Sequence, residues 1–422
     1  MYVTRALEKT FLLYAEQFAC ITLYGARQVG KSTLVEKLFP RHFTRISMDD
    51  PLLRARAKND PTNFIGSFSL PLCIDEIQKA SELLEPIKAI IDTRKKEWTL
   101  EGKPRKLLFI LTGSNQSDLR AAVNESLSGR TAILNLPSFS HAEIARYDRF
   151  EPFDPDIHVL KERAIELQTK RSRKEIFEDI FRGGMPEYIV EGTDRNAFFS
   201  SYIQTYFEKD VSGFVKTENL PTFLRFMQYL ALRTACPVNY SDLSLAIGIE
   251  VPTVRHWLNI LITSKIVILL EPYAKNLSNR IVKTPKLHFL DTGLCAFLGR
   301  WPNAETLENG PLSGNYYETY VVSEILKSFL NAGFDPDLAS DKQLYYYRDR
   351  DQKEIDLIIE NALGIYPIEI KKGIRPSNPN KNFNVLSKFG KRVFPGFIID
   401  SGDRIYKIND NAYEVPMELI GF

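Results

Sequence analysis

Residues 25–32, which read Gly-Ala-Arg-Gln-Val-Gly-Lys-Ser, constrain the fold of this chain more than any other feature. They fit the pattern G-x-x-x-x-G-K-[ST], the P-loop that cradles phosphates. The apolar run 18–24 before them predicts a buried strand, and segment 33–39 after them has helical spacing. Strand, glycine loop and helix in this order predict an α/β domain built on a parallel sheet. The alternative is a glycine turn that merely precedes an ordinary helix.

The residue types in this loop suit a nucleotide polyphosphate. Glycines let backbone N–H groups curl around phosphate oxygens, and the N-terminus of a helix adds partial positive charge. Lys31 is expected to reach the β- and γ-phosphates, and the Ser32 hydroxyl is expected to ligate Mg²⁺. We therefore expect ATP and Mg²⁺ as cofactors. The expected nucleotide-binding residues are Gly25, Ala26, Arg27, Gln28, Val29, Gly30, Lys31, Ser32 and Thr33.

A second apolar segment, residues 70–74, ends in the two acids Asp75 and Glu76. Asp75 is the candidate carboxylate on the metal side of the site. Glu76 is placed to activate the attacking water as a general base. An Asp-Glu pair alone is weakly informative, because helices often begin with acids. Its position about 40 residues after the loop makes the catalytic interpretation the favoured one.

A third apolar run, residues 106–111, is expected to end between the first two strands. Ser114 or Asn115 at its end is then the candidate sensor of the γ-phosphate, and a plain helix N-cap is the alternative. Arg130 is a further candidate, which would contact the γ-phosphate in its own chain or in a neighbouring chain. An arginine that merely forms a surface ion pair explains it equally well. The strand predicted over 131–136 completes the parallel sheet.

Several short motifs occur in an order that resembles one known family. Besides the P-loop they are Ile-Asp-Glu-Ile-Gln at 74–78, Leu-Thr-Gly-Ser at 111–114, Ser-Gly-Arg at 128–130 and Phe-Arg-Gly-Gly-Met-Pro-Glu at 181–187. Over nearly the whole chain this is similar to the bacterial and archaeal AAA-type ATPases that carry a C-terminal domain of unknown function. The resemblance implies ATP binding and slow hydrolysis, but no cellular task. Ser32 stands where threonine is commoner, and both hydroxyls can ligate Mg²⁺.

The middle of the chain, residues 216–290, predicts a winged helix-turn-helix. Helical patterns over 240–248 and 251–262 precede a strand pattern over 265–272. In the DNA-binding version of this motif the second helix enters the major groove. That helix and a basic wing would then supply the contacts, from Thr253, Arg255, Asn259, Arg280, Lys283 and Lys286. The alternative is a winged helix that contacts protein or acts as a rigid spacer.

The C-terminal segment brings acids and a lysine onto one predicted hairpin. Asp356 lies on its first strand, and Glu369 and Lys371 share a face of the second strand. Glu318 on a preceding helix is expected to join them, in preference to Glu324, because Gly314 precedes it. This resembles the PD-(D/E)xK nuclease superfamily, which implies Mg²⁺ bound by carboxylates and a lysine that orients or deprotonates water. The alternative is a half-exposed hairpin whose polar face happens to hold these residues.

Bulk properties narrow the choice of partners and location. Lys+Arg 55 against Asp+Glu 53 gives a net charge of +2, so a nucleic-acid site would have to be a local patch. The 4 cysteines lie in apolar runs without a Cys-x-x-Cys pair, which predicts buried thiols in a reducing compartment. The start of the chain lacks the apolar core of a signal peptide, and no apolar run is long enough to span a membrane. We expect a cytoplasmic protein.

The sequence thus predicts an α/β chain of three parts. Residues 1–215 are expected to form an AAA-type P-loop NTPase domain with a helical extension. Residues 216–290 would form the winged helix-turn-helix, and residues 291–422 a restriction-endonuclease-like domain. The leading hypothesis is an ATP-hydrolysing protein that associates with DNA. One alternative is an ATP-gated protein-binding switch with an inert nuclease-like domain, and another is a regulatory or toxin–antitoxin-type partner protein. The residue patterns leave a protein partner and a homo-oligomer open.

Overall fold

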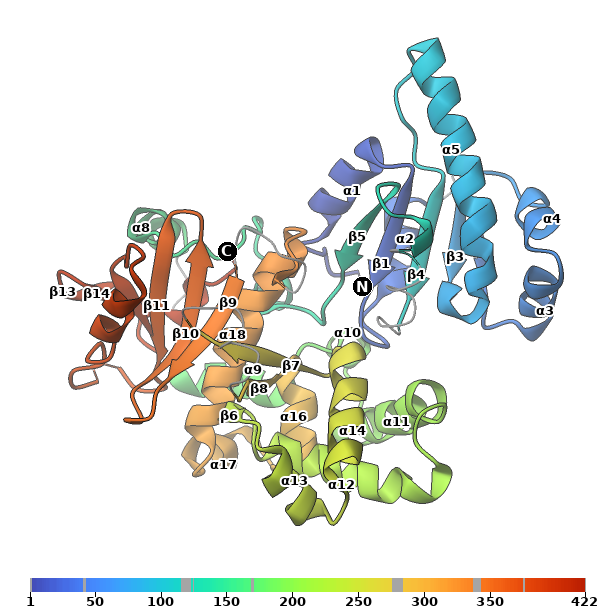
Figure 1. Ribbon diagram of the computed structural model, residues 1–422. Coiled ribbons are helices and arrows are strands. Elements are labelled where there is room, and N and C mark those ends of the chain that lie inside the picture. Colours follow the sequence, from blue (N-terminus) through green and yellow to red (C-terminus); the bar gives the residue numbers. More distant parts are fainter. Residues whose placement is uncertain are drawn as a thin grey trace. The chain divides into compact units, whose positions relative to one another are not determined.

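The structure is a computed structural model that describes residues 2–40, 43–114, 123, 125–167, 171–274, 284–336, 343–374 and 376–421. The chain forms two units (Figure 1). The N-terminal unit comprises Tyr2–Ser138 and Leu330–Gly333. The C-terminal unit comprises Phe139–Phe329 and Phe334–Phe422.

A five-stranded parallel sheet in the order β2-β3-β4-β1-β5 forms the centre of the N-terminal unit. The strands are β1 (Cys20–Tyr24), β2 (Thr44–Ser47), β3 (Leu72–Asp75), β4 (Phe109–Gly113) and β5 (Thr131–Asn135). Strand β4 therefore lies between β1 and β3, as predicted. Because the strands run in parallel, the residues that follow β1, β3 and β4 meet at one edge of the sheet.

Helices cover both faces of this sheet. They are α1 (Glu8–Gln17), α2 (Lys31–Leu38), α3 (Pro51–Asn59), α4 (Pro61–Gly66), the 3-10 helix η1 (Ile77–Leu83) and α5 (Leu84–Glu101). Alternate strand residues enter two apolar clusters, since successive side chains of a strand point to opposite faces. Leu111 packs with Ile87 of α5 in one cluster, and Ile110 packs with Phe11 and Leu34 of α1 and α2 in the other.

The C-terminal unit is built on one nine-stranded sheet, in the order β13-β14-β12-β11-β10-β9-β7-β8-β6. Its strands are β6 (Cys236–Pro237), β7 (Val267–Pro272), β8 (Lys286–Phe289), β9 (Gln343–Arg348), β10 (Glu354–Asn361), β11 (Gly364–Ile370), β12 (Gly396–Asp400), β13 (Tyr406–Asn409) and β14 (Ala412–Pro416). Strands β6, β8 and β7 are antiparallel neighbours, and β7 pairs in parallel with β9. This last pairing joins segments that the sequence assigned to separate domains.

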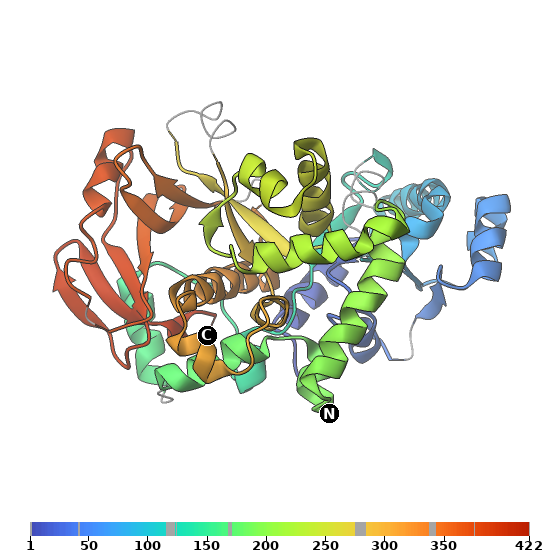
Figure 2. The ribbon, with the colours of Figure 1, turned by 90° about the horizontal axis from the view of Figure 1, so that it is seen from below.

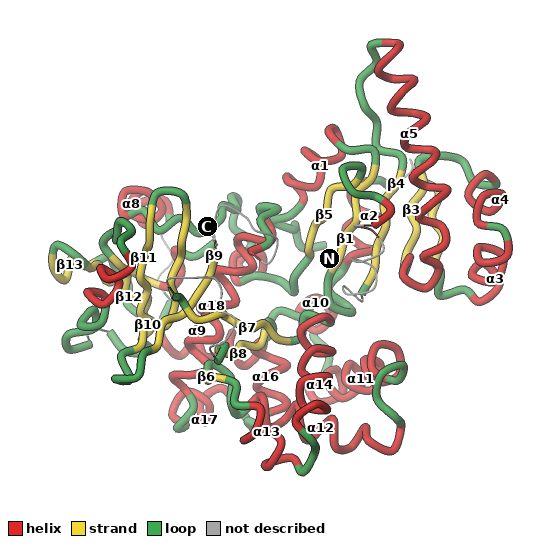
Figure 3. The backbone as a smooth tube through the Cα atoms, viewed as in Figure 1, coloured by secondary structure: helices red, strands yellow, loops and turns green. Residues whose placement is uncertain are grey.

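The helices of this unit begin with α7 (His141–Ala145), α8 (Ile157–Glu166), α9 (Arg173–Arg182), α10 (Pro186–Glu191) and α11 (Arg195–Tyr206), followed by the π-helix η2 (Phe207–Val211). The chain then turns back (Figure 2) through the 3-10 helix η3 (Thr217–Asn219) into α12 (Leu220–Ala231). The remaining helices are α13 (Tyr240–Ile247), α14 (Val251–Thr263), α16 (Thr292–Leu298), α17 (Ala304–Asn309) and α18 (Ser313–Asn331), with 3-10 turns η5 (Phe383–Phe389) and η6 (Met417–Leu419). Figure 3 colours these helices and the strands along the backbone.

The division of the chain differs from the expected boundaries at residues 215 and 290. The helical segment from Phe139 onward belongs to the C-terminal unit, where α9 contacts α16 and α17. The Gly-Gly pair of the motif at 181–187 makes this contact, since the Gly184 N–H donates to Asp291 Oδ2 at 2.9 Å. Gly183 has a φ of +73°, and a Cβ there would lie 2.5 Å from Asp291 Oδ1. Glycine is therefore required for the close approach of these two segments.

Candidate functional site

The P-loop follows β1 and leads into α2. Gly30 precedes α2 with a φ of +89°, a left-handed conformation that favours glycine. Lys31 is the first residue of α2, and its ammonium donates to the carbonyls of Gly25 and Ala26, both at 3.0 Å. The lysine is 7% exposed, so its charge is held inside the loop. This places a cation among backbone groups at the N-terminus of a helix, the arrangement suited to phosphate.

Two contacts that the sequence did not predict hold the P-loop against the chain that follows β5. A Cβ on Gly25 would lie 2.4 Å from the carbonyl oxygen of Leu136, so the loop passes directly against the chain after β5. The Arg5 guanidinium is buried and donates to the carbonyl of Val29 at 2.8 Å and to that of Pro137 at 2.7 Å. Arg5 thus ties the loop to the same segment. Nothing in the sequence around Arg5 indicates this role, because the partners are backbone carbonyls.

Asp75 ends β3 and faces the start of α2. Its Oδ2 lies 3.5 Å from the Ser32 hydroxyl, and its Oδ1 accepts a hydrogen bond from Thr112 at the end of β4. A hydroxyl and a carboxylate are hard oxygen donors of the kind that Mg²⁺ prefers. Ser32 and Asp75 therefore fit this ion. Thr112 was missed by the sequence analysis, although a polar residue at this strand end was expected.

Glu76 lies beside Asp75 and is directed into the same edge of the sheet. The residue is 6% exposed and has a φ of +55°. Its Oε2 accepts hydrogen bonds from the Ser114 hydroxyl at 3.2 Å and from the Gln78 side-chain amide. The structure thus brings Ser114 to Glu76, while Asn115 lies outside the described residues. Two contacts on one oxygen hold the carboxylate in a fixed orientation.

Arg130 is not brought to this edge. It precedes β5, and the first residue of β5 pairs with Cys20 at the start of β1, whereas the P-loop follows the end of β1. At about 3.3 Å per residue, the two sites in one chain are separated by the length of the strand. Arg130 forms a two-pronged ion pair with Asp92 of α5, with N···O distances of 2.7 and 2.9 Å. Hydrogen bonding to Asp92 raises the pKa of Arg130.

The four residues of the expected nuclease-like site do lie together in the C-terminal unit. Asp356 on β10 accepts a hydrogen bond from the Ile370 N–H of β11 at 2.8 Å. Lys371 lies 3.6 Å from Asp356 and 2.6 Å from Glu369. Glu318 comes from α18 and lies 2.6 Å from Lys286, which is 3.9 Å from Asp356. Glu324 instead pairs with Lys327 at 2.8 Å.

A cation that the sequence placed elsewhere lies among these acids. Lys286, expected on a basic wing, is 1% exposed. Its Nζ lies 2.6 Å from Glu318, 2.5 Å from Glu354 and 3.9 Å from Asp356. Burial raises the pKa of Glu318 to about 8 and that of Glu369 to about 7, because charged carboxylates lose water there. The expectation of an exposed Lys286 is wrong because β8 is an inner strand of the sheet.

The resemblance to metal-dependent nucleases implies Mg²⁺ at this cluster, and the arrangement does not fit it. The Lys286 ammonium takes the position between Glu318 and Glu354 that a shared cation would need. Throughout the described part of the chain, no group of three or more His, Cys, Asp or Glu residues is arranged to hold a metal ion.

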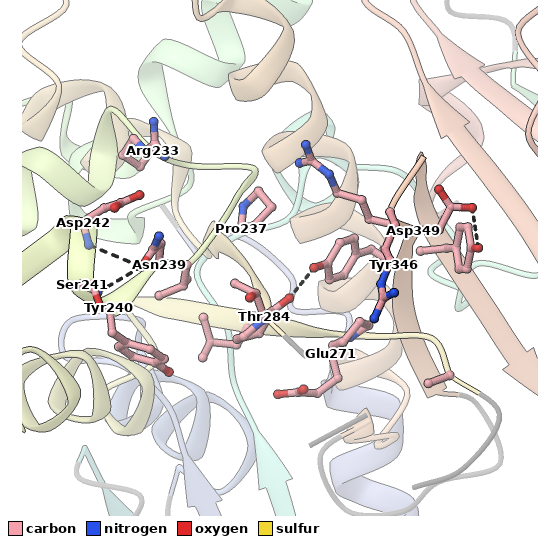
Figure 4. Close-up of a pocket in the computed structure, with 18 of the residues that line it drawn as sticks. Arg233, Pro237, Asn239, Tyr240, Ser241, Asp242, Glu271, Thr284, Tyr346 and Asp349 are labelled. Atoms are coloured by element: carbon pink, nitrogen blue, oxygen red, sulfur yellow. Dashed lines mark hydrogen bonds between the residues drawn. The ribbon is translucent and has the colours of Figure 1, made fainter. Parts of the chain in front are cut away.

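A groove of 1170 Å³ opens between α13 and α14 on one side and β9 with η5 on the other (Figure 4). Figure 4 shows Arg233 and Tyr240 on one side and Tyr346 and Asp349 on the other. The basic residues that line it are Arg233, Arg255, Arg348, Arg350 and Lys388. The acidic ones are Asp242, Glu271 and Asp349. The groove therefore carries an excess of positive charge.

Three of these arginines have no carboxylate partner among the residues that the structure describes. Arg233, Arg255 and Arg350 are exposed, and none forms an ion pair with any residue that the structure describes. Arg255 stacks over the Tyr240 ring at 4.4 Å. The sequence had singled out Arg255 from α14 but missed Arg350, which lies far along the chain. Thr253 and Asn259 are on α14 as expected, and Arg280 and Lys283 fall outside the described residues.

The remaining expectations concern cysteines and membranes. Cys20, Cys73 and Cys295 are buried free thiols, and Cys236 is partly buried. Burial raises the pKa of Cys20 and of Cys73 to about 12, so neither is a reactive thiolate. Among the helices described here, none is both long and apolar enough to cross a membrane.

Three family descriptions match successive parts of the chain. Residues 17–145 match an AAA domain, residues 173–305 match a domain of unknown function (DUF8612), and residues 313–420 match another (DUF4143). The N-terminal unit therefore has an AAA-type ATPase fold. The first boundary, near residue 145, lies close to the division between the two units at residue 138.

Two curated relatives match over most of their length. They are the uncharacterized proteins Rv2008c of Mycobacterium tuberculosis and Mb2031c of Mycobacterium bovis, each 24% identical over 406 residues, which is 95% of this chain and 80% of the relative. Among solved structures, the Aeropyrum pernix ORC2 protein matches with a TM-score of 0.33 at 14% identity, covering 72% of this chain and 91% of that chain. A mutant of RuvB from Thermotoga maritima gives 0.27 at 16%, covering 62% and 86%.

Proposed function

We propose that this chain binds ATP with Mg²⁺ at the P-loop and hydrolyses it slowly. The observation that carries the proposal is the meeting of Lys31, Ser32, Asp75 and Glu76 at the carboxyl ends of β1 and β3, the two strands that flank β4 in one parallel sheet. A loop that binds phosphate, oxygen donors for a metal and an oriented carboxylate are the parts that phosphoryl transfer to water needs. The AAA-domain match over residues 17–145 supports the same activity.

The loop and Lys31 bind the phosphates in this account. Lys31 now donates to the carbonyls of Gly25 and Ala26, and it would exchange these bonds for oxygens of the β- and γ-phosphates. The N-terminus of α2 adds positive potential at the same place. Ser32 and Asp75 would hold Mg²⁺, which when bound neutralises phosphate charge.

Glu76 acts on the water. Its Oε2 is fixed by Ser114 and Gln78, so we assign Oε1 to the attacking water. Oε1 accepts a proton as the water oxygen bonds to the γ-phosphorus, and the bond from phosphorus to the β–γ bridging oxygen breaks to release ADP. Arg130 can contribute to this site only from a second chain, because in its own chain it lies at the opposite edge of the sheet. A homo-oligomer is thus a condition for that role.

The test is steady-state ATP hydrolysis by the full chain and by Lys31→Ala. The matched control is Lys37→Ala, which removes a lysine from the last turn of the same helix. We expect turnover to fall at least 100-fold in Lys31→Ala, since a P-loop lysine binds phosphates directly, and to stay within twofold in Lys37→Ala. Equal turnover in Lys31→Ala and in the unmodified chain would contradict the site.

A second function, DNA binding by the C-terminal unit, is favoured by the groove between α14 and β9. We propose that Arg233, Arg255 and Arg350, which form no ion pair within the described part of the chain, contact phosphates of the DNA backbone. The element order α12, β6, α13, α14, β7, β8, with an antiparallel β6-β8-β7 sheet, supports a winged helix-turn-helix here. The groove places cations of that motif opposite cations from the C-terminal strands.

Salt dependence tests this proposal. Fluorescence anisotropy with labelled duplex and single-stranded oligonucleotides would compare the full chain with Arg255→Ala/Arg350→Ala and with the exposed control Arg404→Ala. We expect the double variant to bind more weakly and the slope of log K against log salt to fall by about 2, one for each lost phosphate contact. An unchanged slope, or ATP turnover indifferent to DNA, would favour the protein-binding switch instead.

A further inference from the structure

We propose that Lys286 is a built-in cation of the carboxylate cluster in the C-terminal unit. In this proposal the nuclease-like arrangement of Glu318, Asp356, Glu369 and Lys371 binds no divalent metal and cleaves no phosphodiester bond. The sequence pattern alone predicts the opposite, because Lys286 is separated from the pattern in the chain and reaches it only through the fold. The proposal does not depend on ATP hydrolysis at the P-loop.

The Lys286 ammonium bonds two carboxylates of the cluster directly. An ammonium carries three N–H donors, and that of Lys286 has Glu318 Oε1 at 2.6 Å and Glu354 Oε1 at 2.5 Å. The third carboxylate, Asp356, has Oδ1 at 3.9 Å from the same nitrogen. A magnesium ion needs near-octahedral oxygens at about 2.0–2.1 Å. The Lys286 nitrogen therefore occupies the space between Glu318 and Glu354 that an ion shared by these two carboxylates would need.

Lys286 is enclosed by the described part of the C-terminal unit. It is 1% exposed and lies on β8, an inner strand paired with β7 and β6. Its neighbours on that strand, Leu287, His288 and Phe289, are buried as well. The Tyr346 ring lies 5.6 Å from the ammonium, and the Tyr346 hydroxyl is held by the carbonyl of Thr284. These contacts hold the ammonium beside Glu318 and Glu354.

The negative charge of the cluster is balanced by side chains of the chain itself. Each carboxylate of the cluster already has a cation: Glu318 has Lys286, Glu354 has Lys286 and Arg348, and Asp356 and Glu369 have Lys371. An added divalent ion would share a desolvated space with the Lys286 charge, and like charges repel strongly when buried. The cluster therefore works as an internal ion-pair network that ties β8 to α18 and β10.

The first arm of the test uses the intact cluster. Mn²⁺ bound to the full chain would be measured by electron paramagnetic resonance without nucleotide. The chain would carry Asp75→Asn, which removes the candidate metal ligand beside the P-loop. Adding Asp356→Asn to this variant should leave Mn²⁺ binding unchanged. A Mn²⁺ ion that is bound by Asp75→Asn and lost on adding Asp356→Asn would overturn the proposal.

The second arm of the test removes the Lys286 ammonium. Lys286→Met in the Asp75→Asn background should gain about one Mn²⁺ per chain, because the carboxylates lose their counter-ion, and Asp356→Asn should abolish the gain. Lys372→Met is the matched control, since Lys372 bonds Ser313 and the Glu308 carbonyl rather than the cluster. If Lys286→Met does not fold, Lys286→Gln replaces it, keeping hydrogen-bond donors without the charge. A folded Lys286 variant that gains no Mn²⁺ overturns the proposal.

Discussion

Replacing Gly25 by alanine should damage the P-loop by a predictable amount. The new Cβ would lie 2.4 Å from the Leu136 carbonyl oxygen and 2.9 Å from Cγ2 of Val29. The first neighbour is backbone, so the loop must move rather than a side chain. Inserting one carbon into such a contact costs about 1–3 kcal/mol. For a unit of this size we expect the melting temperature of the N-terminal unit to fall by roughly 3–10 °C.

The same shift should weaken nucleotide binding, which separates this prediction from a general loss of stability. A ligand at 100 times its Kd stabilises the folded chain by about 2.7 kcal/mol. Thermal unfolding with and without MgATP should therefore show a large ATP-dependent shift in the unmodified chain and little in Gly25→Ala. The matched control is Gly66→Ala, where a Cβ meets no atom of the described chain within 4 Å. An unchanged melting temperature and an unchanged ATP shift in Gly25→Ala would refute the reasoning.

Three further predictions concern stability. The pKa of Glu318 is raised from 4.5 to about 8 in the folded chain. Its proton therefore stabilises the fold fully below about pH 4.5, and this contribution is lost as the pH rises to about 8. Urea denaturation should show the unfolding free energy falling over this range, and falling less in Glu318→Gln. Arg5→Ala leaves the buried carbonyls of Val29 and Pro137 without their donor and should cost roughly 2–4 kcal/mol by the same assay. Arg130→Ala breaks only a partly exposed ion pair and should cost less than about 1 kcal/mol, and a larger loss would show an unrecognised role.

The sequence predicted most where the site is local in the chain. Strand, loop and helix around Lys31 are contiguous, so the P-loop and its flanking elements followed from pattern alone. The convergence of Asp75 and Ser114 followed from one physical rule, that the ends of neighbouring parallel strands meet at one edge. The same rule places Arg130 at the other edge, because Arg130 comes directly before β5 and not after it.

The sequence predicted least where the fold joins distant segments. Alternation along a hairpin brought Asp356, Glu369 and Lys371 together, but the Lys286 contact depends on β7 pairing with β9 across a long stretch of chain. No periodic pattern of apolar residues in the sequence indicates such a pairing. Arg5 was missed for a different reason, since its partners are backbone carbonyls that any sequence supplies. The division near residue 138 was also not predicted, since the contact of Gly184 with Asp291 joins segments far apart in the chain.

The most direct test of the account is a single-turnover measurement on Glu76→Gln. The variant would be incubated with Mg²⁺ and γ-labelled ATP, separated from free nucleotide, and followed for release of phosphate. The glutamine cannot accept a proton, while the loop, Lys31 and Asp75 are unchanged, so we predict that ATP stays bound and is cleaved at least 100-fold more slowly than by the unmodified chain. Phosphate release at the unmodified rate would contradict the assignment of Glu76 and with it the proposed site.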